Sequence, residues 1–139
     1  MNKLKTLLRL IGVVQLILGL GFLVAPSTFL VLMGLSVPAP DNNYMFGMLA
    51  ARFLAYGVGM FAIARAPEEN RFWINNMILI QIIDLAAGLF YTFTGVVNFM
   101  NAIFPMFNAT LFIVLLWLWR PQVSQKPGER AKDVALGSQ

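Results

Sequence analysis

The sequence contains no cysteine and no histidine among its 139 residues. Without cysteine the chain cannot form a disulfide, a thiolate metal site or a cysteine nucleophile, and its redox compartment cannot be read. Without histidine it lacks the commonest general base and the commonest transition-metal ligand. Haem bound through histidine, di-iron sites of Glu and His, and Ser-His-Asp triads are therefore excluded. We expect no catalysis by this chain and no cofactor.

Charged residues are also scarce, at 12% of the chain, which is about half the share found in a typical soluble domain. Hydrophobic residues make up 59%, and the mean hydropathy is +0.74. A hydrocarbon core roughly 30 Å thick needs about 20 apolar residues per helix. Four segments meet this requirement, at about residues 7–25, 44–64, 73–95 and 102–119. Because they almost lack polar faces, the sequence predicts an all-α polytopic membrane protein, a four-transmembrane-helix antiparallel bundle.

Prolines and charged residues mark the ends of these predicted helices. The first helix should end near Pro26, because proline lacks an N–H group and clashes inside a helix. Residues 26–34 predict a short helix that lies at the membrane interface, since it is too short to span. The clearest break is the loop of residues 65–71. Pro105 fits the first turn of the fourth helix, with Asn101 as its candidate cap.

The basic residues predict how the chain is oriented in the membrane. Nine of the ten Lys and Arg residues fall on one side of the four-span arrangement, and the two loops on the other side contain none. The positive-inside rule then places both termini in the cytoplasm, with residues 121–139 as a polar tail. Topology thus explains the basic character of the chain, and we expect no nucleic-acid partner. The nine are Lys3, Lys5, Arg9, Arg65, Arg71, Arg120, Lys126, Arg130 and Lys132.

Arg52 is the tenth, and it lies inside a predicted span. A charge at the bilayer centre costs roughly 2.5–3.5 kcal/mol on insertion scales, so such residues usually face the bundle interior and pair. Asp84 is the one acidic residue inside a span; it lies thirteen residues from Arg71, as Arg52 does from Arg65. At about 1.5 Å per residue, both sit roughly 20 Å from the same boundary. The second and third spans should be antiparallel neighbours, so the sequence predicts an Arg52–Asp84 ion pair.

Other polar side chains lie near this depth and complete a predicted polar layer: Gln15, Tyr56, Gln81 and Asn108. One interpretation is that the layer holds the helices together, through hydrogen bonds of about 0.6–2 kcal/mol each. Other interpretations are a site for a small ligand or headgroup, or a proton-coupling site, since ionisable residues inside a membrane are functional candidates. The structural interpretation is preferred, because neither a second acid nor a histidine relay accompanies the pair.

A small residue recurs at every fourth position of the second span, at Gly47, Ala51, Ala55 and Gly59. Such a ridge allows close approach of helix backbones. The favoured interpretation is packing within the bundle, where glycines of the first and third spans would meet the ridge. The alternative is an interface with a second copy or another membrane protein.

The segment FLVAPSTFLVLMGL at the end of the first span, ARFLAYGVGM in the second and the aspartate of the third after a basic loop form a familiar arrangement. Over about residues 7–119 the chain resembles the small four-helix membrane proteins related to DoxX and the uncharacterised bacterial families near them. The resemblance implies a four-helix bundle in the bacterial inner membrane. Some DoxX relatives are described as membrane subunits associated with oxidoreductases and quinone chemistry. No catalytic residue is transferred, because the chain has no Cys or His for a redox role.

Two functions of different classes follow. The preferred one is a structural or accessory subunit without catalysis, which packs in the lipid bilayer against other membrane subunits or a second copy of itself. The alternative is a binding protein or carrier for a small amphiphile, a quinone or lipid, or for another small solute. In that case Arg52, Asp84 and Gln81 would form the polar end of the site.

Overall fold

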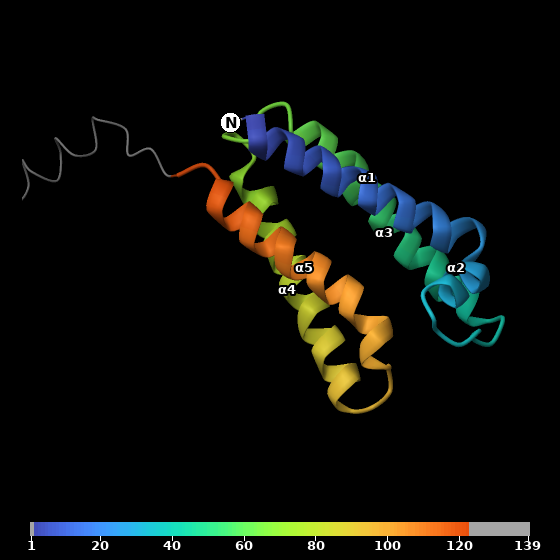
Figure 1. Ribbon diagram of the computed structural model, residues 1–139. Coiled ribbons are helices and arrows are strands. Elements are labelled where there is room, and N and C mark those ends of the chain that lie inside the picture. Colours follow the sequence, from blue (N-terminus) through green and yellow to red (C-terminus); the bar gives the residue numbers. More distant parts are fainter. Residues whose placement is uncertain (1, 123–139) are drawn as a thin grey trace, which may run out of the picture.

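The computed structural model describes residues 2–122, and within them it is all-helical (Figure 1). Four helices, α1, α3, α4 and α5, have 23, 22, 23 and 21 residues and are long and apolar enough to cross a membrane. The predicted all-α fold with four membrane-spanning helices is therefore confirmed. Of the predicted tail, only residues 121 and 122 are among those described. The elements are α1 (Asn2–Val24), α2 (Pro26–Leu32), α3 (Asn42–Ile63), α4 (Arg71–Phe93) and α5 (Phe99–Trp119).

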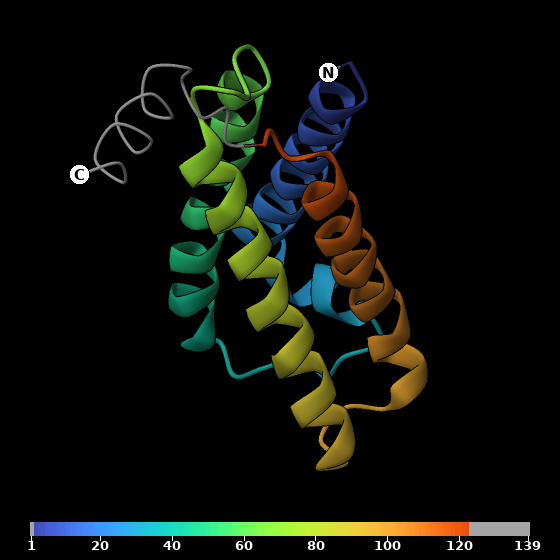
Figure 2. The ribbon, with the colours of Figure 1, turned by 90° about the vertical axis from the view of Figure 1, so that its left-hand side faces the viewer.

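The long helices form two antiparallel pairs, α1 with α3 and α4 with α5, which make most of the contacts between helices. The pairs meet where the N-terminus, the α3–α4 loop and the end of α5 lie, and they spread apart toward the opposite end (Figures 1 and 2). We call the first the basic end, because it carries Lys3, Lys5, Arg65, Arg71 and Arg120. The second is called the open end, and the short helix α2 lies there.

Glycines set the close contact between α1 and α3. A Cβ atom at Gly12 would lie 3.0 Å from the carbonyl oxygen of Gly57, and one at Gly57 would lie 3.1 Å from the carbonyl oxygen of Gly12. About two turns further along α1, a Cβ at Gly19 would lie 2.8 Å from the side chain of Leu54. With no side chain between them, the two backbones can approach closely enough to gain extensive van der Waals contact. This contact makes α1 and α3 one packing unit.

Two apolar clusters hold the fold, one toward each end. The basic-end cluster joins all four long helices. The second cluster, which we call the Phe22 cluster, lies at the open end: the ring of Phe22 stacks on Phe46 with centroids 5.6 Å apart and meets the edge of Phe29 at 5.0 Å. It joins α1, α2 and α3, so it leaves α4 and α5 out. The basic-end cluster contains Leu4, Leu7, Leu8, Ile11, Met60, Ile63, Ala64, Ile74, Met77, Ile78, Phe112 and Leu116.

The predicted short helix after α1 is present, and proline occupies its first turn as expected. It is followed by Gly34, whose φ of 74° lies in the left-handed region that glycine adopts without strain. The helix is only 7 residues long, which is far too short to cross a bilayer.

The start of the fourth span differs from the sequence-based expectation. α5 begins at Phe99, so Asn101 and Pro105 both lie inside the helix and Asn101 is not its cap. The cap is Asn98, whose side-chain oxygen accepts a hydrogen bond from the backbone N–H of Met100 at 2.9 Å. The spacing of Pro105 suggested a later start, because proline is usual in a first turn. The helix instead tolerates an internal proline.

Asn101 has a different structural role. Its Nδ2 atom donates a hydrogen bond to the carbonyl oxygen of Gly34 at 2.7 Å, which ties the first turn of α5 to the end of α2. Because Pro105 has no N–H group, the carbonyl oxygen of Asn101 also lacks its usual helical donor. The hydrogen bond from Asn101 to Gly34 links the two helix pairs across the open end of the bundle.

Candidate functional site

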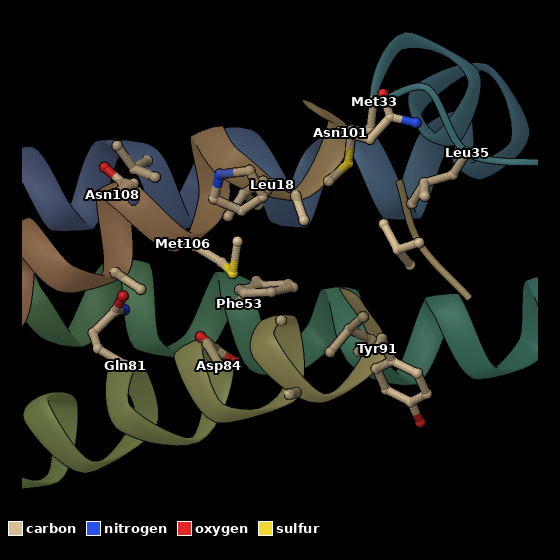
Figure 3. A pocket seen from close by; sticks show the side chains of 18 of the residues that line it. Leu18, Met33, Leu35, Phe53, Gln81, Asp84, Tyr91, Asn101, Met106 and Asn108 are labelled. Carbon is tan, nitrogen blue, oxygen red and sulfur yellow. The ribbon is translucent and has the colours of Figure 1, made fainter. Parts of the chain in front are cut away.

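A cavity of about 350 Å³ lies between the two helix pairs (Figure 3). It is bounded by Phe112 of the basic-end cluster and by Phe22 of the Phe22 cluster, and its other walls are mainly apolar. Pockets that hold small molecules in proteins have volumes of about 300–1,000 Å³ and mostly apolar linings. The cavity exists because the helix pairs diverge, so that apolar side chains do not fill the space between them.

Four polar side chains of the predicted layer meet in this cavity. Gln15 comes from α1, Gln81 and Asp84 come from α4, and Asn108 comes from α5. In Figure 3 the side chains of Gln81 and Asp84 point from α4 into the cavity, and Asn108 lies on α5. Four of the six residues of the predicted polar layer therefore line one cavity.

The two glutamines have hydrogen-bonding capacity that the protein does not use. Gln15 and Gln81 are each only 4% exposed. The Nε2 atom of Gln81 lies 3.7 Å from the sulfur of Met77, which is a weak acceptor. Within residues 2–122, the carboxamide of Gln15 has no hydrogen-bond partner, yet no unpaired side-chain nitrogen or oxygen in this part of the chain is sealed off. The free amide groups therefore face the cavity that the two side chains line.

The structure does not bring Arg52 and Asp84 together. Asp84 lines the central cavity, whereas Arg52 lines a separate pocket of about 580 Å³ with Tyr56 and Trp73. In the described part of the chain, the predicted ion pair is therefore not formed. The position of a residue along a helix does not fix the direction in which its side chain points. Moreover, α3 and α4 approach each other only near their loop and diverge toward the open end (Figures 1 and 2).

Tyr56 also leaves the predicted layer. Its hydroxyl oxygen accepts a weak hydrogen bond from Nδ2 of Asn76 at 3.4 Å, so it connects α3 to α4 nearer the basic end. Arg52 is exposed, and with Ala55 and Gly59 it lines the α3 side of the pocket that Trp73 of α4 borders. The layer is thus divided between two places, with four residues in the cavity and two on the α3 side.

The small-residue ridge does not pack within the described chain, so the favoured interpretation was wrong. A Cβ atom at Gly47 or at Gly59 would meet nothing within 4 Å, and Ala51 and Ala55 are exposed. α1 packs instead along the face of α3 that carries Gly57, which lies about 200° around the helix from Ala55. We call the exposed surface made by the ridge and Arg52 the α3 outer face.

A residue that the sequence did not assign to the site is Asn101. It lines the cavity and also a neighbouring hollow of about 610 Å³ that runs between α5 and the α1–α2 segment. Leu18 and Met33 likewise line both spaces, so the hollow adjoins the cavity. The signal for Asn101 was its polarity in an apolar helix, but the assignment as a helix cap had already accounted for it.

No protein-family model, curated protein or solved structure matches this chain when it is compared with them. The resemblance to DoxX-related proteins stays a prediction, and the site is described from its own residues.

Proposed function

We propose that the protein binds a small amphiphile in the cavity between its helix pairs and has no catalytic activity of its own. The observation that carries this proposal is the meeting of Gln15, Gln81, Asp84 and Asn108 in an otherwise apolar cavity of about 350 Å³. A mostly apolar pocket with a few convergent polar groups is the usual form of a small-molecule site. The sequence favoured an accessory subunit, because a cavity between diverging helices cannot be read from hydropathy.

The neighbouring hollow supports an amphiphile over a fully polar solute. It is lined by apolar side chains of α2 and α5, including Phe29, Leu32 and Phe104. Leu32 and Phe104 are 79% and 77% exposed, so the hollow reaches the surface that would face lipid tails. A headgroup in the cavity could therefore keep its hydrocarbon chain in the hollow and in the adjacent bilayer.

Lipid extraction from the purified protein tests the proposal. The protein is isolated in mild detergent, and the extracted molecules are compared by mass spectrometry with those of a Gln81→Leu variant. We expect one enriched species in the wild type that is lost in Gln81→Leu. The substitution removes an amide group from the cavity and puts an apolar side chain of similar size at the same buried position. The matched control is Gln122→Leu, which makes the same change at an exposed position after α5. An identical extract from all three proteins would contradict the proposal, provided that they elute as folded species.

The α3 outer face favours a second candidate, a subunit that packs in a homo-oligomer or a larger membrane complex. An exposed arginine at membrane depth costs roughly 2.5–3.5 kcal/mol on insertion scales, so a partner that brings a carboxylate or a hydrogen-bond acceptor to it would be stabilising. The ridge beside Arg52 would let another helix approach closely. Native mass analysis should then give an oligomer that Ala55→Leu dissociates, while Ala86→Leu, at an exposed position of α4, leaves it intact. A wild-type protein that stays monomeric and without partners would refute this candidate.

We also propose that the protein lies in a bacterial inner membrane with both termini in the cytoplasm. The support is the gathering of Lys3, Lys5, Arg65, Arg71 and Arg120 at the basic end, since positive charge is retained on the cytoplasmic side. A fluorescent protein fused at the C-terminus should fluoresce, and alkaline phosphatase fused there should be inactive. Phosphatase inserted after Val37 should be active. The reverse pattern would contradict the orientation.

A further inference from the structure

The cavity has an unbalanced charge. Among the described residues that line it, Asp84 is the one with a carboxyl group, and none is a lysine or an arginine. The basic residues of the described chain gather at the basic end, and Arg52 lines a different pocket. The cavity therefore offers a negative group to a ligand and no positive group.

The remaining polar groups do not neutralise this carboxylate. The other polar side chains of the lining bring no positive charge; they are the carboxamides of Gln15, Gln81, Asn101 and Asn108 and the phenol of Tyr91. A carboxylate within a membrane is costly when it has no opposite charge near it. Binding of a cation would remove that cost, whereas binding of an anion would add repulsion to it.

We propose that the ligand is a single-chain amphiphile with a positively charged nitrogen headgroup, which binds with its charge beside Asp84. This inference rests on the proposed function, because it specifies the chemistry of the molecule held in the same cavity. A phospholipid fits less well, since its phosphate would find no cation in the lining. A neutral quinone would leave the carboxylate without a counter-charge.

The surroundings of Asp84 favour a methylated or alkylated ammonium over a strongly hydrated one. Phe53 on α3 and Met106 on α5 line the same cavity as Asp84, and Figure 3 draws the three side chains in it. Aromatic faces attract cations through their quadrupole, and alkylated ammonium ions are the cations that such apolar linings accommodate. The hydrocarbon chain would pass Leu18 and Met33 into the neighbouring hollow.

The test measures binding to the full-length protein in nanodiscs of phosphatidylcholine by isothermal titration calorimetry. The probes are dodecyltrimethylammonium, its neutral counterpart dodecanol and the quinone decylubiquinone, each below its aggregation concentration. The variants are Asp84→Asn, which removes the charge with almost no change of shape, and Gln81→Leu. The control is Asp41→Asn, the same substitution at an exposed position before α3.

We expect the wild type to bind dodecyltrimethylammonium about tenfold or more tightly than dodecanol, as a nearby opposite charge in a partly dehydrated site would produce. Asp84→Asn should abolish this preference, because it should weaken dodecyltrimethylammonium more than dodecanol. Gln81→Leu should weaken both probes, and Asp41→Asn should change nothing. If Asp84→Asn does not fold, the preference of the wild type decides the question by itself.

The outcomes separate the two proposals. A preference that persists in Asp84→Asn, or a wild type that prefers dodecanol or decylubiquinone, would overturn the cationic headgroup and leave the amphiphile site standing. If the wild type binds none of the three probes above the level of empty nanodiscs, both proposals fail.

Discussion

Replacing Gly57 by alanine should loosen the packing of α1 against α3, whereas the same change two residues later should not. A Cβ atom at Gly57 would lie 2.8 Å from the side chain of Leu16 and 3.1 Å from the carbonyl oxygen of Gly12. Leu16 can rotate away, but the backbone oxygen moves only if the two helices separate. At Gly59 an added Cβ would meet nothing within 4 Å. The two positions lie in the interior of the same helix, so they form a matched pair.

The expected magnitudes follow from two opposing effects. Overpacking a tight contact costs about 1–3 kcal/mol, and alanine regains about 1 kcal/mol of helix propensity relative to glycine. Gly57→Ala should therefore lower the free energy of unfolding by about 1 kcal/mol, while Gly59→Ala should raise it by up to about 1 kcal/mol. Helix propensity cancels in the difference between the variants, which should be about 1–3 kcal/mol.

The measurement is unfolding by sodium dodecyl sulfate in mixed micelles, followed by circular dichroism at concentrations where the protein is monomeric. Monomeric conditions are needed because Gly59 lies on the α3 outer face, where substitution would also affect any association. Equal stabilities of Gly57→Ala and Gly59→Ala would refute the glycine contact. A loss of stability in Gly59→Ala alone would show that the ridge, and not Gly57, faces α1.

Three further substitutions probe the turns at the open end. Gly95 has a φ of 74° and free space around it, so Gly95→Ala should lower stability in the same titration by about 1–2 kcal/mol through backbone strain alone; an unchanged value would contradict the left-handed turn. Asn101→Ala removes the 2.7 Å hydrogen bond to Gly34, so it should lower the free energy of unfolding by about 1 kcal/mol. It should also speed hydrogen exchange in α2, and unaltered exchange would show that this bond does not hold α2. Asn98→Ala removes the cap of α5 and should cost about 1 kcal/mol, whereas Asn98→Asp should retain most of the stability.

The sequence predicted the helices well because the membrane imposes a strong length and polarity requirement on each span. The short helix at Pro26 was also predictable, since proline and Gly34 define its two ends. The beginning of α5 was not, because Asn98 and Asn101 are equally good caps on sequence grounds. Pro105 favoured the later of the two, and the structure uses the earlier one.

The candidate site was only half predictable for a related reason. Counting along helices predicted a shared layer for Gln15, Gln81 and Asp84, and all three line the cavity. The direction of each side chain depends on which face of its helix packs against a neighbour. Because α3 carries small residues on two faces, the sequence did not show which of them packs against α1. A usable signal was the spacing of seven between Gly12 and Gly19, which matches the spacing of Ala50 and Gly57 across the pair.

The order of the helix pairs along the chain has a consequence for biosynthesis. The first pair comes from residues 2–63 and the second from residues 71–119, so each pair is a continuous hairpin. The main contacts of each helix lie within its own hairpin. Each hairpin can therefore enter the bilayer and close on itself as it leaves the ribosome, before the other half is needed. We expect the two hairpins to reassemble when they are produced as separate polypeptides divided within residues 65–70. The cavity then lies at the interface between two independently inserted hairpins, and it forms only in the last step of assembly.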